Sequence, residues 1–215
     1  PTAEQKTTYL QKLWKKTYLD DVVERHNVEN REALEAIADA LCSSIGSLTN
    51  TTRITNTLGS VRKIKITDDT VAKYIGYLEE AFLFNEARRY NIKGNRYYEN
   101  IKKYYSIDVG LRNARLNYRQ LEQTHLMENI IFNELLYRGY VVDVGVVEHR
   151  KMVDGKSEYK QYEVDFIATD GHEKYYIQSA YEIETEEKRE QELNSLKRID
   201  DSFRKIVIVK DDIMT

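Results

Sequence analysis

Two acidic side chains and one amide occur in an order that suits magnesium-dependent cleavage of a phosphodiester. Glu128 lies in a stretch whose apolar residues recur at helical spacing, and Asp165 and Gln178 lie in consecutive strand-like segments. Enzymes of this kind hold Mg²⁺ through carboxylate and other oxygen atoms, and a lysine usually lies near the attacking water. The sequence therefore presents Glu128, Asp165 and Gln178 as candidate catalytic residues, with Glu128 and Asp165 as the candidate metal ligands.

These residues follow the order used by the restriction-endonuclease-like fold, which takes an acid from its first helix, an Asp from its second strand and Glu/Gln-x-Lys from its third. Ala180 occupies the lysine position, so no cation there assists the attacking water. Three interpretations stay open: an altered site that no longer cleaves, a structural role, or a Mg²⁺-dependent nuclease with a relocated cation. A structural role requires Asp165 to be paired, because a carboxylate in an apolar strand is otherwise costly.

The middle of the chain is basic, although the whole chain has a formal charge of −3. Residues 53–119 carry 14 basic and 7 acidic side chains, whereas residues 120–215 carry 13 and 21. A basic patch drives sequence-independent binding to nucleic acid, so DNA is one expected partner. The alternatives are a charged face that pairs with the acidic half of the chain and a protein-contact surface. The candidate nucleic-acid-binding residues are Arg53, Arg62, Lys63, Lys65, Lys73, Arg88 and Arg89.

Several counts exclude other classes of protein. Cys42 is the one cysteine, which rules out a disulfide framework within the chain and a cysteine zinc site, and the four histidines are dispersed. No apolar run reaches 18 residues and no signal-peptide core is present, so we expect a cytoplasmic protein without a membrane partner. No Gly-x-x-x-x-Gly-Lys-Ser/Thr motif occurs, so this chain binds no cofactor through a P-loop. Since the chain begins at Pro1 without methionine, we interpret it as part of a longer protein.

The first half of the chain has the pattern of a winged-helix unit. An amphipathic helix is predicted over Asn30–Ile45, a short helical segment over Arg53–Leu58 that Gly59 stops, and a third helix that Thr67 caps. A strand-like segment, Phe82–Ile92, follows them. We therefore expect a helical winged-helix domain over residues 1–96, of which residues 1–28 are a helical lead-in from an earlier domain.

The second half predicts an α/β domain over residues 97–215. A helix begins near Thr124 and ends at Gly139, and three strands follow, with turns at Asp154-Gly155 and Asp170-Gly171. A charged helix and a short, apolar strand that we expect to be buried complete the order α-β-β-β-α-β. This order favours a mixed sheet covered by helices, and the overall class is α+β or α/β. The predicted strands are Tyr140–Val147, Tyr159–Ala168, Lys174–Tyr181 and Lys205–Val209, and the charged helix is Thr185–Arg198.

The chain resembles the C-terminal region of prokaryotic AAA-type P-loop ATPases, a region labelled a domain of unknown function. The resemblance covers essentially the whole chain and implies a winged helix followed by a restriction-endonuclease-like domain. It also implies an ATPase domain before Pro1 that binds ATP and Mg²⁺, with this chain as an accessory module that recognises DNA or protein. The family commonly has Gln followed by an apolar residue where active nucleases have Glu-x-Lys. The matching segments include VAKYIGYLEEAFLFNEARRYN (71–91), KKYYSIDVGLRN (102–113), MENIIFNELLYRGYVV (127–142), EVDFIA (163–168) and YYIQSAY (175–181).

Overall fold

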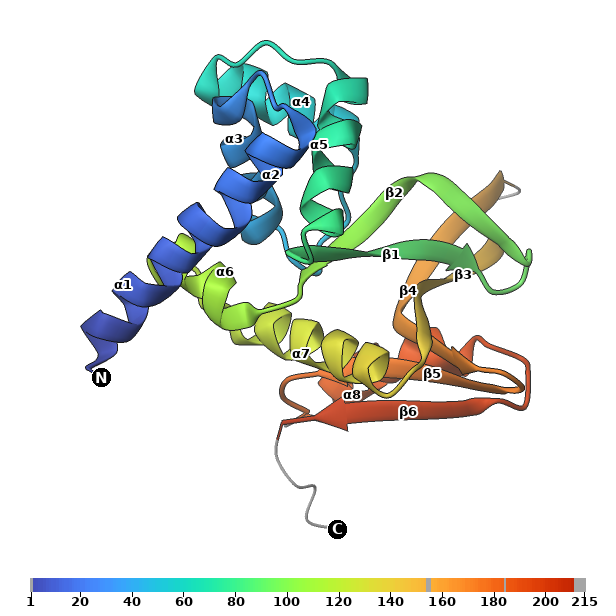
Figure 1. The fold of residues 1–215 in the computed structure, drawn as a ribbon. Helices are drawn as coiled ribbons and strands as arrows, with labels where there is room; N and C mark the ends of the chain where they lie inside the picture. The colour runs from blue at the N-terminus through green and yellow to red at the C-terminus, as the bar shows by residue number, and fades with distance from the viewer. Residues whose placement is uncertain (1, 154–155, 184, 211–215) are drawn as a thin grey trace. The chain divides into compact units, whose positions relative to one another are not determined.

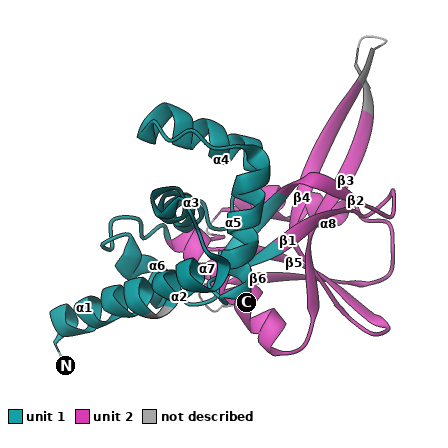
Figure 2. Cartoon of the chain, turned by 45° about the horizontal axis from the view of Figure 1, so that its top comes forward, with its two compact units in different colours: residues 1–86, 102–122 teal, residues 87–101, 123–215 magenta. Residues whose placement is uncertain are grey.

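The computed structural model describes residues 2–153, 156–183 and 185–210, and it divides the chain into two compact units (Figure 2). Unit 1 comprises residues 1–86 and 102–122, and unit 2 comprises residues 87–101 and 123–215. Two strands, β1 (Phe84–Asn91) and β2 (Arg96–Ser106), begin in one unit and end in the other. Each unit is therefore assembled from two separate stretches of chain.

Unit 1 is mostly helical. Three successive helical segments follow one another without a break from Ala3 to His26, and the middle one is a π-helical turn. A second π-helical turn, Leu58–Arg62, directly follows α4. No helix in the described part of either unit is long and apolar enough to cross a membrane. The elements of unit 1 are α1 (Ala3–Leu13), the turn Trp14–Leu19, α2 (Asp20–His26), α3 (Arg31–Ser43), α4 (Thr51–Thr57), α5 (Asp68–Glu80) and α6 (Val109–Arg115).

Side-chain caps begin the helices of unit 1 where the sequence indicates. The side-chain oxygens of Asn30, Asn50 and Thr67 each accept a hydrogen bond from the backbone N–H of the third residue of α3, α4 and α5. These contacts confirm the predicted starts of the first and third helices. The predicted stop at Gly59 is wrong, because the π-helical turn carries the chain on to Arg62 and ends at Lys63, whose φ of 59° is left-handed.

The core of unit 1 gathers apolar faces from all of its long helices. Leu34, Ile37 and Leu41 of α3 are fully buried, as the helical spacing of these residues predicts. Trp14 is 1% exposed and lies edge-to-face against Phe84, with ring centroids 6.3 Å apart. The N-terminal helical stretch therefore packs into the same core as the helices that follow it.

Unit 2 is built on a six-stranded mixed sheet with the order β2-β1-β3-β4-β5-β6 (Figure 1). The β3–β4 and β4–β5 pairs are antiparallel, and the β1–β3 and β5–β6 pairs are parallel. This sheet confirms the mixed topology and the α-β-β-β-α-β order expected for the second half. Its further elements are α7 (Gln123–Tyr137), β3 (Val141–Val153), β4 (Lys156–Asp170), β5 (Glu173–Ala180), α8 (Glu186–Lys197) and β6 (Arg204–Val209).

Helices α7 and α8 cover opposite faces of this sheet. Phe132 of α7 contacts Phe166 of β4, with ring centroids 6.1 Å apart. Leu196 of α8 instead packs in a cluster with Ile167 of β4 and Tyr176 of β5. Because successive residues of a strand point to opposite faces, Phe166 and Ile167 bury the two sides of the sheet under different helices.

Two features of the sheet differ from the sequence expectation. The strand-like segment Phe82–Ile92, expected to belong to the winged-helix unit, forms β1, which pairs in parallel with β3 through Arg89↔Val144 and so extends the sheet of unit 2. The last strand, β6, was expected to be buried, yet it lies at the end of the sheet order and Ile206 is 37% exposed. The turn at Asp170-Gly171 is present, with a left-handed φ of 54° at Gly171. The turn expected at residues 154–155 lies outside the described residues.

Candidate functional site

The candidate nuclease-like site is centred on a bulge in β4. Asp143 of β3 pairs with Ile167, but Gly145, two residues on, pairs with Val164, so β4 carries one extra residue at Asp165–Phe166. A Cβ added at Gly145 would lie 2.9 Å from the Cβ of Val164. Glycine at position 145 therefore permits the close approach of the two strands beside the bulge.

The bulge places the carboxylate of Asp165 against the neighbouring strand. Asp165 is 8% exposed, and its Oδ2 accepts a hydrogen bond from the backbone N–H of Ser179 at 2.7 Å. The β4–β5 ladder reaches Phe166↔Ile177 and includes no pair beyond it. The side chain of Asp165 therefore provides an acceptor where the backbone ladder ends.

Gln178 is held by α8. Its Oε1 accepts a hydrogen bond from Ser195 Oγ at 3.4 Å, and its Nε2 donates to Glu192 Oε2 at 3.4 Å. Gln178 shares its strand face with Tyr176, which belongs to the cluster under α8. Ala180, at the position where active nucleases have lysine, lies on that face and is 2% exposed.

Glu128 lies half-buried in α7. The structure therefore places Gln178 and the helix that carries Glu128 on opposite faces of the sheet, and Asp165 at the bulge between them. Within residues 2–153, 156–183 and 185–210, no three His, Cys, Asp or Glu side chains are close enough together to hold a metal ion. Because Mg²⁺ is often held by one or two carboxylates together with water and substrate oxygens, Glu128 and Asp165 stay candidate ligands, and we derive no step through the ion.

Sequence reasoning missed the residues that position these side chains. Gly145 sits inside an apolar strand pattern, and an isolated glycine in such a pattern is a signal of a bulge or of close backbone approach. Glu192 and Ser195 lie in the predicted charged helix, but their contact with Gln178 has no local sequence signal.

The predicted nucleic-acid-binding residues are divided between the units. Arg53, Arg62, Lys63, Lys65 and Lys73 lie in unit 1, and Arg88 and Arg89 lie in unit 2. Counted by unit, the charges nearly balance in unit 1, with 16 basic and 15 acidic side chains, and acidic groups prevail in unit 2, with 17 and 21. The basic stretch of the sequence therefore does not become a strongly basic unit.

Four of the seven basic side chains have a hydrogen-bond acceptor or an ion-pair partner within their own unit. Arg62 contacts Asp39 at 3.1 Å, and Arg53 donates to the carbonyl of Leu48 at 3.1 Å. Arg88 lies 3.9 Å from Asp143, and Arg89, which is 7% exposed, donates to Gln161 at 3.3 Å. Lys63, Lys65 and Lys73 are exposed, and the Lys73 ammonium lies 5.8 Å from the ring centroid of Tyr77.

Aromatic rings accompany the two arginines of unit 2. The Arg88 guanidinium lies 4.0 Å from the ring centroid of Tyr97, whose hydroxyl donates to Asp143 at 2.8 Å. Burial raises the pKa of the Asp143 carboxyl, while the Tyr97 hydrogen bond and the charge of Arg88 oppose that shift. Arg88 and Tyr97 therefore both contact one half-buried carboxyl group, that of Asp143.

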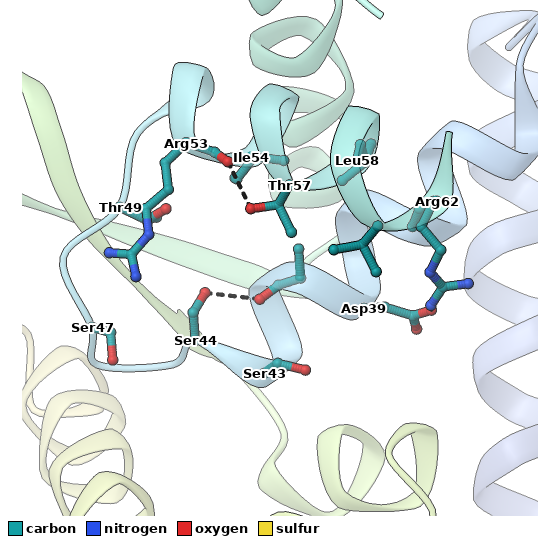
Figure 3. A pocket seen from close by; sticks show the side chains of 13 residues that line it. Asp39, Ser43, Ser44, Ser47, Thr49, Arg53, Ile54, Thr57, Leu58 and Arg62 are labelled. Carbon is teal, nitrogen blue, oxygen red and sulfur yellow. Dashed lines mark hydrogen bonds and ion pairs between the residues drawn. The ribbon is translucent and has the colours of Figure 1, made fainter. Parts of the chain in front are cut away.

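Arg53 and Arg62 line a hollow of about 430 Å³ in unit 1 (Figure 3). Its walls come from α3, α4, the loop between them and the π-helical turn that follows α4. Asp39 lies beside Arg62, and the hydroxyls of Ser44 and Thr57 donate to backbone carbonyls of their own helical turns. The three charged side chains of this hollow and two of its hydroxyls thus have partners within the protein.

Comparison with known protein families identifies the family of this chain. The model of the family described as "Domain of unknown function (DUF8612)" matches residues 1–122. The chain belongs to this family. The matched residues of this DUF8612 chain end at residue 122, which is also the last residue of unit 1, so Glu128, Asp165 and Gln178 lie beyond the matched region.

Relatives of the DUF8612 chain are found in both bacteria and archaea. An uncharacterized protein of Haemophilus influenzae is 34% identical over 203 residues, which cover 94% of this chain and 47% of the relative. An uncharacterized protein of Methanocaldococcus jannaschii is 29% identical over 181 residues, which cover 81% of this chain and 38% of the relative. The chain thus spans less than half the length of these curated relatives. No solved structure matches it.

Proposed function

We propose that this DUF8612 chain is a non-catalytic recognition region of a larger cytoplasmic AAA-type ATPase. The observation that carries the proposal is the hydrogen bond from Ser179 N–H to Asp165 Oδ2 at 2.7 Å, beside a Gln178 that is bonded to α8. Asp165, one of the two candidate metal ligands, and Gln178 make these contacts within unit 2, and we interpret them as structural. The buried Ala180 leaves no lysine to assist a water molecule.

The proposal includes a winged-helix fold for residues 1–96 and a restriction-endonuclease-like fold for the domain that contains the sheet. The succession α3, α4, α5 and then two strands supports the first. The order α7-β3-β4-β5-α8-β6, with a bulge at the strand that carries Asp165, supports the second. Bulges are frequent next to active sites. In this chain the bulge is present, and the carboxylate of Asp165 accepts a hydrogen bond from the backbone N–H of Ser179.

We favour a protein over DNA as the partner. Nucleic-acid binding depends on basic groups that are free to neutralise phosphates. Unit 1 carries nearly equal numbers of basic and acidic groups, and Arg53, Arg62, Arg88 and Arg89 already have acceptors in the protein.

A cleavage assay tests the absence of nuclease activity. The chain is incubated with supercoiled plasmid DNA and with Mg²⁺ or Mn²⁺, alongside the Asp165→Ala variant. We expect both proteins to leave the plasmid intact over the same range of pH and salt. Metal-dependent cleavage that disappears in Asp165→Ala would overturn the proposal and establish the alternative of a Mg²⁺-dependent nuclease.

DNA recognition is the second candidate, and the exposed side chains of Lys63 and Lys65 favour it. If the chain binds duplex DNA, its affinity falls steeply as salt rises, because bound cations are released from the phosphates. Replacing Lys63 and Lys65 by Glu then weakens binding and reduces the salt dependence, whereas Lys188→Glu in α8 is the matched control. An affinity for DNA that changes neither with salt nor in the Lys63/Lys65 variant would exclude this candidate.

The ATPase part of the proposal is tested on the full-length protein. We expect it to bind and hydrolyse ATP, and a version without residues 1–215 to retain nucleotide binding. A full-length protein that binds no ATP would contradict the proposed parent.

A further inference from the structure

The strand β6 presents an open edge. In the sheet formed by the described strands, β6 is the terminal strand and its one neighbour is β5, from Tyr175↔Arg204 to Ala180↔Val209. The backbone groups on the outer side of a terminal strand have no ladder partner and are available to another strand. Among the described residues, no further strand covers the outer edge of β6, which can accept an added chain.

The composition of β6 is that of a strand covered on both faces. Ile206, Val207, Ile208 and Val209 are four consecutive apolar residues, without the alternation typical of a strand that has one wet face. Ile206 is nonetheless 37% exposed, and the following three residues are only half-buried. Unit 2 alone leaves part of this apolar surface in contact with water.

A largely apolar groove, whose lining also includes the ion-paired Glu134 and Arg138, lies beside the same strand. It has a volume of about 490 Å³, and α7 contributes Ile130, Ile131 and Leu135 to its walls. Ile177 of β5 and Ile206 and Ile208 of β6 line the opposite side. Ile130 is 57% exposed at its rim. A strand added next to β6 would place alternate side chains along this lining, which we call the α7 groove.

The charges around β6 limit what can be added. Arg204 and Lys205 precede the four apolar residues, and Lys210 follows them, all three being exposed. Lys205 also donates to the carbonyl of Asp201 at 2.9 Å, and the Lys210 ammonium lies 4.9 Å from the ring centroid of Tyr181. In an antiparallel pair of two β6 strands centred on Val207, Arg204 would face Lys210 of the other copy. Like charges directly opposite each other destabilise a strand pair, whereas acidic side chains at those positions stabilise it.

We propose that the edge of β6 and the α7 groove bind an extended peptide segment that has alternating apolar residues between acidic ends. Main-chain hydrogen bonds to β6 supply affinity, the groove selects apolar side chains, and Arg204, Lys205 and Lys210 select the acidic ends. This proposal rests on the proposed function in one respect: both assume that the chain acts by binding rather than by cleaving DNA. The plasmid assay tests for cleavage, and its result does not depend on whether the peptides bind.

Fluorescence polarisation with two labelled synthetic peptides tests the proposal. Both peptides alternate valine with threonine; one has two glutamates at each end and the other two lysines. We expect the glutamate peptide to bind about tenfold or more tightly than the lysine peptide, a difference that narrows as salt rises. Arg204→Glu should weaken binding of the glutamate peptide and strengthen that of the lysine peptide.

A matched pair of variants on α7 tests the groove. Ile130→Glu places a charge at its rim, whereas Tyr137→Glu changes a residue of the same helix that is 88% exposed and outside the groove lining. We expect Ile130→Glu alone to abolish peptide binding, with both variants folded by circular dichroism. Amide hydrogen exchange should slow in β6 when the glutamate peptide is bound.

Three results would overturn the proposal: equal affinity for the two peptides, unchanged binding in Ile130→Glu, or exchange in β6 that the peptide does not slow. Self-association that sedimentation detects and Ile130→Glu disrupts would also overturn it, because the occupant would then be a second copy of the chain.

Discussion

Asp165 Oδ2 accepts the backbone N–H of Ser179 at 2.7 Å, at the point where the β4–β5 ladder ends. The bulge at Asp165–Phe166 displaces β4 locally, and the carboxylate takes the place of a backbone acceptor. A polar group in a buried strand is tolerated when it is hydrogen-bonded, so this contact accounts for an aspartate between Val164 and Phe166. The same contact supports the proposed structural role of Asp165.

Removing the Asp165 carboxylate should destabilise unit 2. Asp165→Ala leaves the Ser179 N–H without its acceptor, at a cost of about 1–3 kcal/mol in the free energy of unfolding. Asp165→Asn keeps an acceptor oxygen and should lose less. Urea unfolding followed by circular dichroism measures the loss, and exchange of the Ser179 amide hydrogen localises it. Glu158→Ala, exposed on the same strand, is the control. Equal stability of Asp165→Ala and the unchanged chain would contradict this assignment.

A methyl group at Gly145 should be poorly tolerated. Its Cβ would approach the Cβ of Val164 to 2.9 Å, and overpacking of this kind costs about 1–3 kcal/mol. Gly76 of α5 is the matched control, because a Cβ there has no neighbour within 4 Å. Gly76→Ala should gain about 0.5–1 kcal/mol, since alanine is the better helix former. Chemical unfolding of both variants measures these changes, and the expectation fails if both shift stability in the same direction.

The stability of unit 1 should depend on the charge of Glu79. Burial raises the pKa of this carboxyl to about 7; the nearby Glu86 adds to the shift and Lys102 opposes it. Because the pKa is higher in the folded than in the unfolded chain, the folded state binds more protons between the two values. This contribution to stability is fully present below the unfolded pKa and is lost as the pH rises through about 7.

The Glu79→Gln variant removes this titration. The unfolding free energy of the unchanged chain should fall, relative to that of Glu79→Gln, as the pH rises through this window. Glu32→Gln, at an exposed position of α3, should leave the pH dependence as it is. A pH dependence that is the same in all three proteins would show that Glu79 is not the responsible group.

Cys42 should be inert until unit 1 unfolds. Its side chain is fully buried in α3, and burial raises the pKa of the thiol to about 12. Only the thiolate reacts with iodoacetamide, so the native protein should be modified far more slowly than the same protein in urea. Because the chain has one cysteine, the modified fraction measured by mass spectrometry reports the opening of unit 1. Modification at the urea rate under native conditions would contradict the buried position.

Local features of the chain are predictable from the sequence alone. The caps at Asn30 and Thr67, the helical spacing of Leu34, Ile37 and Leu41, and the turn at Gly171 all depend on neighbours within a few residues. Such hydrogen bonds and periodicities are encoded locally, which is why the order of elements and the mixed sheet follow from pattern. The candidate residues Asp165 and Gln178 were therefore placed on the correct strands.

What those residues contact was decided by the tertiary structure. The bulge beside Gly145, the bond from Ser179 to Asp165, and the attachment of Gln178 to α8 join residues 14 or more positions apart in the chain or lying on different strands. The pairing of β1 with β3 and the place of β6 at the edge have the same origin. A strand pattern states which residues face a core, but not which strand lies beside it, because that choice depends on packing across the whole sheet. The sequence alone thus determined the elements and the chemical groups of this protein, and only the folded sheet decided that the carboxylate of Asp165 has a partner within the protein.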